Sequence, residues 1–288
     1  MSTPRALVLG ATGMLGHVLL ESLADDYEVH GTVRDAERAR RLGLPGELHP
    51  FEAFAPEGLG PLLADVRPAL VVNAIGLVKQ LEDASRPLPA ITLNALFPHQ
   101  LATACGEAGA RLVHVSTDCV FSGALQPPRA YTEEDVPDAR DVYGRTKLLG
   151  EVSEPGALTL RTSIIGWELE RATGLLEWFA AQNGRSVNGF TRAIFSGLTT
   201  RALGRVIAAV ARDHPDLSGL YQVSADPISK YDLLVRLRDA LGMSTEIEPV
   251  DEPAINRALD SSRFRAATGL EIPSWPAMID EYAQGDRR

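Results

Sequence analysis

The chain has 288 residues, 45% of them hydrophobic and 23% charged, which is enough for a sizeable core in one large domain with a smaller lobe. A net charge of -10 and a pI near 5.1 argue against a nucleic-acid-binding surface. Cys105 and Cys119 make no disulfide framework, and neither a signal-peptide pattern nor an 18-residue apolar run is found. We therefore expect a cytoplasmic protein with reduced thiols and no membrane segment.

A glycine-rich loop follows a short apolar strand at residues 6–9. Residues 10–16 read Gly-Ala-Thr-Gly-Met-Leu-Gly and lead into a helix expected over 14–24. Such glycines permit a tight turn and let backbone N–H groups approach a pyrophosphate. The loop predicts a dinucleotide site, with a purely structural turn as the alternative. The expected cofactor contacts in this loop are Gly10, Thr12, Gly13, Met14, Leu15 and Gly16.

The end of the next strand, residues 28–33, bears on the choice of cofactor. Arg34 follows this strand directly, and Asp35 comes next. An acidic residue at this strand end binds the ribose 2′-hydroxyl of NAD, whereas an arginine suits the 2′-phosphate of NADP. We interpret Arg34 as an NADP(H) contact, with ribose binding by Asp35 as the alternative. A helix is expected over 36–42 and a short strand near 48–51.

Small residues follow the third clear strand, residues 69–73. They would let a cofactor approach closely, with Asn73 as a local hydrogen-bonding anchor, although a simple turn is the alternative. The expected cofactor contacts here are Asn73, Ala74, Ile75 and Gly76. Residues 79–81 form a loop without an assigned role. A helix is expected over 93–106, and His99 within it is interpreted as structural.

Three polar side chains around the next strand carry the chemistry. Residues 112–117 form a short apolar run typical of a buried parallel strand, and Thr117 falls at its carboxyl end, where ligands bind in such sheets. Tyr143 and Lys147 are four residues apart, so on a helix they share one face. A hydroxyl, a phenol and an ammonium can therefore converge on one reacting oxygen.

Reduction of a carbonyl gives each of these groups a role. The phenol of Tyr143 would donate a proton, but with its free pKa of about 10 it is a poor proton relay. The ammonium of Lys147 would lower that pKa and bind a ribose hydroxyl of the hydride donor. Thr117 would orient the substrate oxygen. We predict that Thr117, Tyr143 and Lys147 are catalytic, with a Tyr–Lys pair on a solvated helix face as the alternative.

The rest of the chain continues the alternation of strands and helices. We expect a strand over 157–161 followed by Thr162, helices over 175–183, 201–213 and 229–242, a strand over 220–223, and an irregular tail over 253–288. This pattern predicts an α/β protein with an NAD(P)-binding Rossmann fold, a doubly wound parallel sheet and a smaller carboxyl-terminal substrate lobe. The acidic residues 133–135 look like a solvated turn, and no metal site is expected.

The same pattern divides the chain into two parts. We expect residues 1–165 to form the NADP-binding domain, with 190–225 returning to it. Residues 166–189 and 226–288 would then form the smaller substrate-binding lobe over the strand ends.

Taken together, the motifs resemble the extended short-chain dehydrogenase/reductase family. The matching segments are residues 10–16, Asn73-Ala74-x-Gly76, Ser116-Thr117-Asp118 and residues 143–151. Within that family the chain is similar to the dTDP-4-dehydrorhamnose reductases, whose Ser-Thr-Asp-Tyr-Val-Phe-x-Gly segment stands here at 116–123. Residues 259–264 and 273–275 look like the closing region of those enzymes, so the resemblance covers nearly the whole chain.

The resemblance implies NADPH-dependent reduction of a nucleotide-linked 4-keto-6-deoxy sugar, in nucleotide-sugar or polysaccharide biosynthesis. A nucleotide sugar would be the binding partner, and a homodimer is left open. Ser116, Tyr143, Lys147 and Thr162 join the expected cofactor contacts. The implied substrate contacts are Thr117, Asp118, Val120 and Phe121.

The chain departs from the family pattern where sugar specificity would be set. Cys119 replaces a tyrosine, residues 79–80 differ from the usual loop, and residues 189–200 replace a Pro-Thr segment. One rival interpretation is an epimerase or dehydratase that retains NAD, against which Arg34 and the absence of Glu after Asp118 both weigh. Another is a non-catalytic NADP-binding regulatory subunit, like that of methionine adenosyltransferase. The intact catalytic residues disfavour this second rival.

Overall fold

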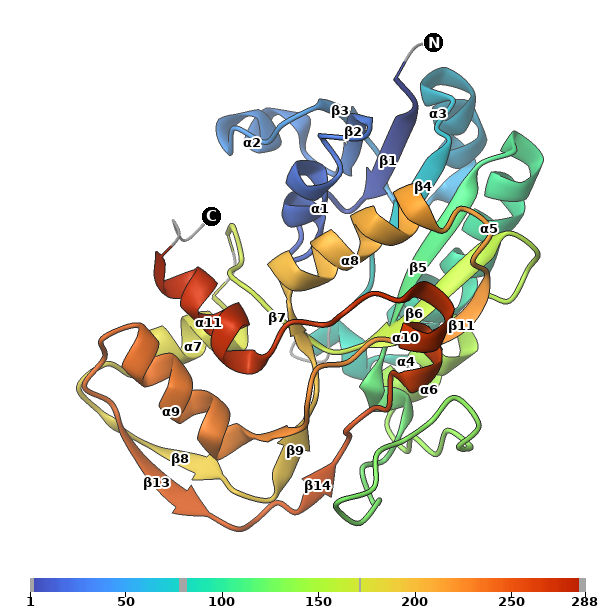
Figure 1. Cartoon of the computed structure of the whole chain (residues 1–288). Helices are drawn as coiled ribbons and strands as arrows, with labels where there is room; N and C mark the ends of the chain where they lie inside the picture. The colour runs from blue at the N-terminus through green and yellow to red at the C-terminus, as the bar shows by residue number, and fades with distance from the viewer. Residues whose placement is uncertain (1–2, 78–81, 171, 285–288) are drawn as a thin grey trace.

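A seven-stranded parallel sheet forms the centre of the molecule in a computed structural model that describes residues 3–77, 82–170 and 172–284 (Figure 1). In spatial order the strands are β3 (Glu47–Pro50), β2 (Glu28–Val33), β1 (Arg5–Leu9), β4 (Leu70–Asn73), β5 (Arg111–Thr117), β6 (Ala157–Thr162) and β11 (Gly219–Gln222). The order reverses between β1 and β4, as in dinucleotide-binding folds. The predicted Rossmann-type, doubly wound sheet is confirmed.

Helices cover both faces of this sheet (Figure 1). They are α1 (Gly16–Ser22), α2 (Ala36–Arg41), α3 (Leu59–Val66), α4 (Pro87–Ala90), α5 (Phe97–Ala108), α6 (Val142–Leu149) and α8 (Thr200–Asp213). Because successive strand residues point to opposite faces, β1 serves two cores. Ala6 and Val8 pack with α1 and α8, whereas Leu7 and Leu9 pack with α3 and α5.

A smaller lobe lies beyond the carboxyl ends of the strands (Figure 1). It contains α7 (Leu175–Ala180), β8 (Ser186–Phe190), β9 (Ala193–Phe195), β12 (Ile228–Ser229), α9 (Lys230–Ala240), β13 (Glu246–Val250), β14 (Ile255–Asn256) and α11 (Trp275–Gln284). The short strands β7 (Ile164–Ile165) and β10 (Leu198–Thr199) pair where the chain passes between the lobes. The Tyr282 hydroxyl hydrogen-bonds Thr200 and the Ile165 carbonyl, at 2.9 and 3.2 Å, and so ties α11 to this junction.

The prediction of an irregular tail over 253–288 is wrong, because this region holds two helices, α10 (Ser262–Thr268) and α11. The large apolar residues of α11 recur at helical spacing, and all of them are buried: Trp275, Met278, Ile279 and Tyr282. Pro276 is the second residue of α11, where a missing N–H costs nothing. The tail's prolines are thus compatible with a helix.

Other expected boundaries also shift. A π-helical turn (Ile91–Leu96) precedes α5, so the helix expected over 93–106 is not uniform. Strand β9 lies in the segment expected to return to the larger domain, yet it pairs with β12 and β14 of the smaller lobe, while α10 packs against β11. Single 3₁₀ turns occur at Pro56–Gly58, Glu82–Ser85 and Asp118–Val120. The loop at 79–81 lies outside the described residues.

No helix in the described part of the chain combines the length and the apolar character needed to cross a membrane.

Candidate active site

A cavity of about 690 Å³ opens at the carboxyl ends of the central strands, between the sheet and the smaller lobe. Most of the predicted site residues line it: Gly10, Thr12, Gly13, Met14, Leu15, Arg34, Asn73, Ala74, Ile75, Gly76, Ser116, Thr117, Asp118, Tyr143, Lys147 and Thr162. They come from the ends of β1, β2, β4, β5 and β6 and from α6. The fold therefore brings together side chains that are separated in sequence by up to about half the length of the chain.

Three predicted site residues do not line this cavity. Gly16 lies beneath the loop, where an added Cβ would be only 2.0 Å from the Gly10 carbonyl oxygen, so its role is to allow the turn. Val120 and Phe121 are fully buried, and the Phe121 ring stacks on Tyr131 with centroids 4.0 Å apart. The 3₁₀ turn after β5 directs both side chains into this small apolar cluster. The structure does not support their predicted contact with substrate.

The glycine loop is held in shape by β2. Gly10 has a φ of +85°, and its N–H donates to the Thr32 hydroxyl at 3.0 Å. The Ala11 N–H donates to the Thr32 carbonyl at 2.9 Å, and the Gly13 N–H to the Gly10 carbonyl at 2.9 Å. Thr32 thus positions the loop through two contacts that the sequence pattern did not reveal.

The strand end after β2 presents arginine rather than aspartate to the cavity. Arg34 is exposed and lines the cavity. The Asp35 carboxylate instead caps α2, accepting the Arg38 N–H at 2.9 Å. Arg38 also lines the cavity, and its guanidinium pairs with Glu170. Arg38 was not predicted, although its position one helical turn beyond Arg34 is a readable signal.

Burial sets the protonation of the Tyr–Lys pair. It raises the pKa of the half-buried Tyr143 phenol, while a hydrogen bond with Thr117 works in the opposite direction. Burial lowers the pKa of Lys147 to about 8, and Glu151 partly opposes this. The Lys147 ammonium donates to the Val115 carbonyl at 2.9 Å. The expectation that the pKa of Tyr143 is lowered is therefore wrong for this structure: the phenol stays protonated and can donate a proton.

Thr117 and Asp118 lie beside the phenol. The Thr117 hydroxyl donates to the Asp118 carboxylate at 3.3 Å and accepts the Cys119 N–H at 3.2 Å. Burial raises the pKa of Asp118, with Arg257 and Lys230 acting against this rise. Both polar side chains lie at the floor of the cavity.

Two cations of the smaller lobe complete the cavity wall. The Lys230 ammonium lies 4.0 Å from the Phe195 ring centroid, and burial lowers its pKa. The Arg257 guanidinium is held by the carbonyls of Phe121 and Ser122, at 2.8 and 3.1 Å. The sequence analysis missed both, because nothing local links these positions to the strand ends. They give the lobe side of the cavity a positive charge suited to an anionic ligand.

Two of the predicted cofactor contacts, Ser116 and Asn73, use their side chains for hydrogen bonds within the protein. The Ser116 hydroxyl donates its hydrogen bond to the Glu151 carboxylate at 2.7 Å, so this proton is already used within the protein. Asn73 acts as the expected local anchor: its carbonyl oxygen accepts the Ile75 N–H at 3.0 Å, and its amide lies 3.1 Å from His114 Nδ1. Both residues shape the cavity floor through their side chains.

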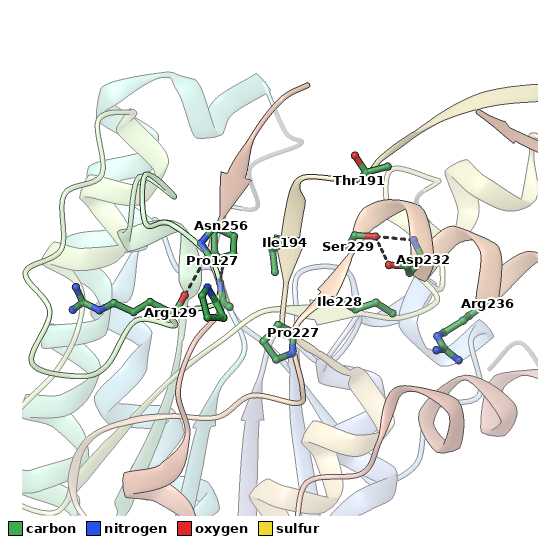
Figure 2. A pocket seen from close by; sticks show the side chains of 12 residues that line it. Pro127, Arg129, Thr191, Ile194, Pro227, Ile228, Ser229, Asp232, Arg236 and Asn256 are labelled. Atoms are coloured by element: carbon green, nitrogen blue, oxygen red, sulfur yellow. Dashed lines mark hydrogen bonds between the residues drawn. The ribbon is translucent and has the colours of Figure 1, made fainter. Parts of the chain in front are cut away.

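A second cavity, of about 470 Å³, lies on the other side of Ile194 (Figure 2). Three of its polar side chains form local hydrogen bonds. Ser229 and Asp232 bond to each other at the start of α9, with 2.6 Å between their side-chain oxygens, and the Asn256 amide donates to the Arg129 carbonyl at 2.9 Å. The Tyr–Lys pair faces the larger cavity, which is therefore the candidate active site.

The doubly wound sheet, with a glycine-rich first turn at its switch-point cavity, defines a dinucleotide-binding protein of the Rossmann class. A family model described as RmlD substrate binding domain matches residues 4–287, and the chain belongs to this family.

Relatives and structures agree with this assignment. The chain is 32% identical to the probable dTDP-4,6-dihydroxy-2-methyloxan-3-one 4-ketoreductase of Streptomyces antibioticus, covering 96% of this chain and 94% of that one. It is 26% identical to mouse methionine adenosyltransferase 2 subunit beta, covering 96% and 89%. The fold matches that of dTDP-4-dehydrorhamnose reductase from Bacillus anthracis, solved in complex with NADP, with a TM-score of 0.83, 21% identity and coverage of 98% and 99%. The predicted family resemblance is confirmed.

Proposed function

We propose that the protein is an NADPH-dependent reductase that acts on the keto group of a nucleotide-linked 4-keto-6-deoxy sugar. The observation that carries this proposal is the placement of Thr117, Tyr143 and Lys147 on one cavity with the glycine loop and Arg34. The names of the relatives support it, since several are reductases of dTDP-linked sugars.

The cavity fits a dinucleotide. The pyrophosphate would lie over Gly13, where an added Cβ would be 3.1 Å from the Gly10 carbonyl oxygen and, apart from the adjoining residues, within 4 Å of no other atom of the described chain. Arg34 and Arg38 would bind the 2′-phosphate, and Lys147 a ribose hydroxyl. NADPH, when bound, supplies the hydride that reduces the keto carbon.

The protein's own groups would handle the proton and the substrate. Tyr143 would donate its phenolic proton to the oxygen of the keto group, because burial keeps that phenol protonated. Thr117 would orient the same oxygen. Lys230 and Arg257 would attract the diphosphate of a nucleotide sugar from the lobe side.

Arg34→Ala should weaken NADPH binding by about 1.5–3 kcal/mol relative to NADH, because one charge-assisted contact with the 2′-phosphate is lost. Fluorescence titration with each cofactor measures the difference. Arg41→Ala is the matched control, since Arg41 is an exposed arginine at the end of the following helix, α2, and does not line the cavity. An equal loss for NADPH and NADH in the Arg34 variant would contradict the assignment.

Gly13→Val should abolish NADPH binding while the protein still folds. In the free protein an added Cβ makes one close contact, at 3.1 Å from the Gly10 carbonyl oxygen, which a shift of a few tenths of an ångström relieves, whereas the pyrophosphate needs the same space. Gly60→Val is the control, because no atom lies within 4 Å of a Cβ added at Gly60. Circular dichroism checks folding and fluorescence titration checks affinity. Unchanged NADPH affinity in the Gly13 variant would remove the loop from the cofactor site.

The direct test of function is incubation with NADPH and a panel of nucleotide-linked 4-keto sugars, with consumption of NADPH followed by absorbance. NMR of the product would give the configuration of the new hydroxyl. The proposal requires turnover of at least one member of the panel. NADPH binding without any turnover would contradict it.

A regulatory, non-catalytic role is the second candidate. The similarity to methionine adenosyltransferase 2 subunit beta, which extends over 96% of this chain, favours it. In this case the protein would bind a methionine adenosyltransferase catalytic subunit and reduce no sugar. An epimerase is distinguished by adding nucleotide-linked 4-hydroxy sugars to the panel, since it would interconvert them without net consumption of NADPH.

A further inference from the structure

Two histidines and a glutamate meet at the open edge of the sheet, outside the active-site cavity. His30 lies on β2, and Glu47 and His49 lie on the edge strand β3. In the parallel register His30 stands opposite Glu47, and His49 is two residues further on. Because strand residues alternate between faces, all three side chains point to the same face of the sheet.

The potential ligand atoms are spaced as around a metal ion. His30 Nδ1 lies 3.0 Å from His49 Nε2 and 3.9 Å from a Glu47 carboxylate oxygen. All three ligand atoms lie within 4.8 Å of one another. Ligands bound tetrahedrally to Zn²⁺ at 2.0–2.2 Å stand about 3.4 Å apart. The two printed separations differ from that value by about half an ångström each, and the Glu47–His49 separation would also have to close to it from at most 4.8 Å.

A second carboxylate stands behind His30. His30 is buried, and its Nε2 has no hydrogen-bond partner among the described residues, although a Glu28 carboxylate oxygen is 3.7 Å away. The other oxygen of Glu28 accepts from Arg5 Nε at 3.1 Å, which holds the carboxylate in place. A metal-bound histidine usually donates its second ring N–H to such a carboxylate. With Nδ1 on a metal, Nε2–H would point toward Glu28.

We propose that His30, Glu47 and His49 bind a divalent transition-metal ion of the Zn²⁺ type, with water as the remaining ligand. Two imidazoles and one carboxylate favour Zn²⁺ over Mg²⁺, which prefers oxygen ligands throughout. The exposed Glu47 gives the ion a route from solvent. A bound metal would link β3 to β2. Residues 51–54, which directly follow β3, line the active-site cavity.

Calorimetric titration of the untagged, chelator-treated protein with Zn²⁺ tests the proposal, and the absorption spectrum with Co²⁺ reports the coordination. We expect one saturable site per chain. Glu28→Gln should weaken Zn²⁺ binding about 10–100-fold, although Glu28 does not touch the ion, because it positions His30. His49→Gln removes a ligand and should weaken binding at least as much.

His99→Gln is the matched control. His99 forms a similar pair with Glu154 at 3.2 Å on the surface, and among the described residues this pair belongs to no group of three potential metal ligands. Its replacement should leave Zn²⁺ affinity unchanged. The proposal is overturned if the wild type shows no saturable site, if His49→Gln titrates like the wild type, or if His99→Gln loses as much affinity as His49→Gln. Tighter binding of Mg²⁺ than of Zn²⁺ would also overturn it.

Discussion

Tyr143→Phe should lower kcat by about 10²–10⁴-fold, because it keeps the ring but removes the proton donated to the reduced carbonyl. NADPH affinity should change little, since the phenol contributes to chemistry rather than to holding the cofactor. Stopped-flow measurement of hydride transfer gives the rate, and fluorescence titration gives the affinity. A rate near that of the wild type would mean that another group is the acid.

Neighbouring variants separate the roles around this phenol. Lys147→Ala should lower kcat and also weaken NADPH binding, because the ammonium would bind the ribose and so hold the hydride donor in place. Thr117→Val should lower kcat less than Tyr143→Phe, since it orients the substrate and transfers no proton. Tyr231→Phe is the control, because Tyr231 is a partly buried phenol that does not line the cavity.

Glu151→Ala should lower the free energy of unfolding by about 3–5 kcal/mol, because it leaves a buried arginine without its counter-charge. Glu151 accepts two hydrogen bonds from Arg161, both at 2.7 Å, and their side chains are only 10% and 4% exposed. Ser116 donates to the same carboxylate. Chemical denaturation at constant pH measures the loss.

Glu281→Ala provides the comparison. Glu281 also accepts two bonds from one arginine, Arg205, at 2.6 and 2.8 Å, but these side chains are 29% and 54% exposed. Removal of an exposed partner should cost at most about 1 kcal/mol. If both variants lost the same stability, burial would not be the cause of the larger effect.

The fold was largely predictable because short strands rich in apolar residues alternate along the chain with helical segments. The prediction of β2 over 28–33 agrees with the structure, and that of β5 differs by one residue at its start. Helix α11 was missed even though its buried positions are spaced like those of any amphipathic helix. In that tail, prolines and charged residues obscured a periodicity that only burial makes evident.

The site was predictable where it depends on local motifs. The glycine loop, Arg34 and the Tyr–Lys pair each follow or precede a strand in a recognisable way. Lys230 and Arg257 could not be found in this manner, because tertiary folding alone brings them to the cavity. The pKa of Tyr143 was misjudged for a similar reason: its environment is set by burial, which no spacing of residues encodes.

The passage of the chain between the two lobes restricts how the proposed specificity for a sugar could be changed. Elements of the smaller lobe come from three separated stretches, 175–195, 228–256 and 275–284, and between them the chain returns to the central sheet as β11 and α10. The smaller lobe therefore cannot be exchanged between homologues as one continuous segment of sequence. A chimera with another enzyme's specificity needs three grafts, and each must preserve the junction at which Tyr282 meets Thr200.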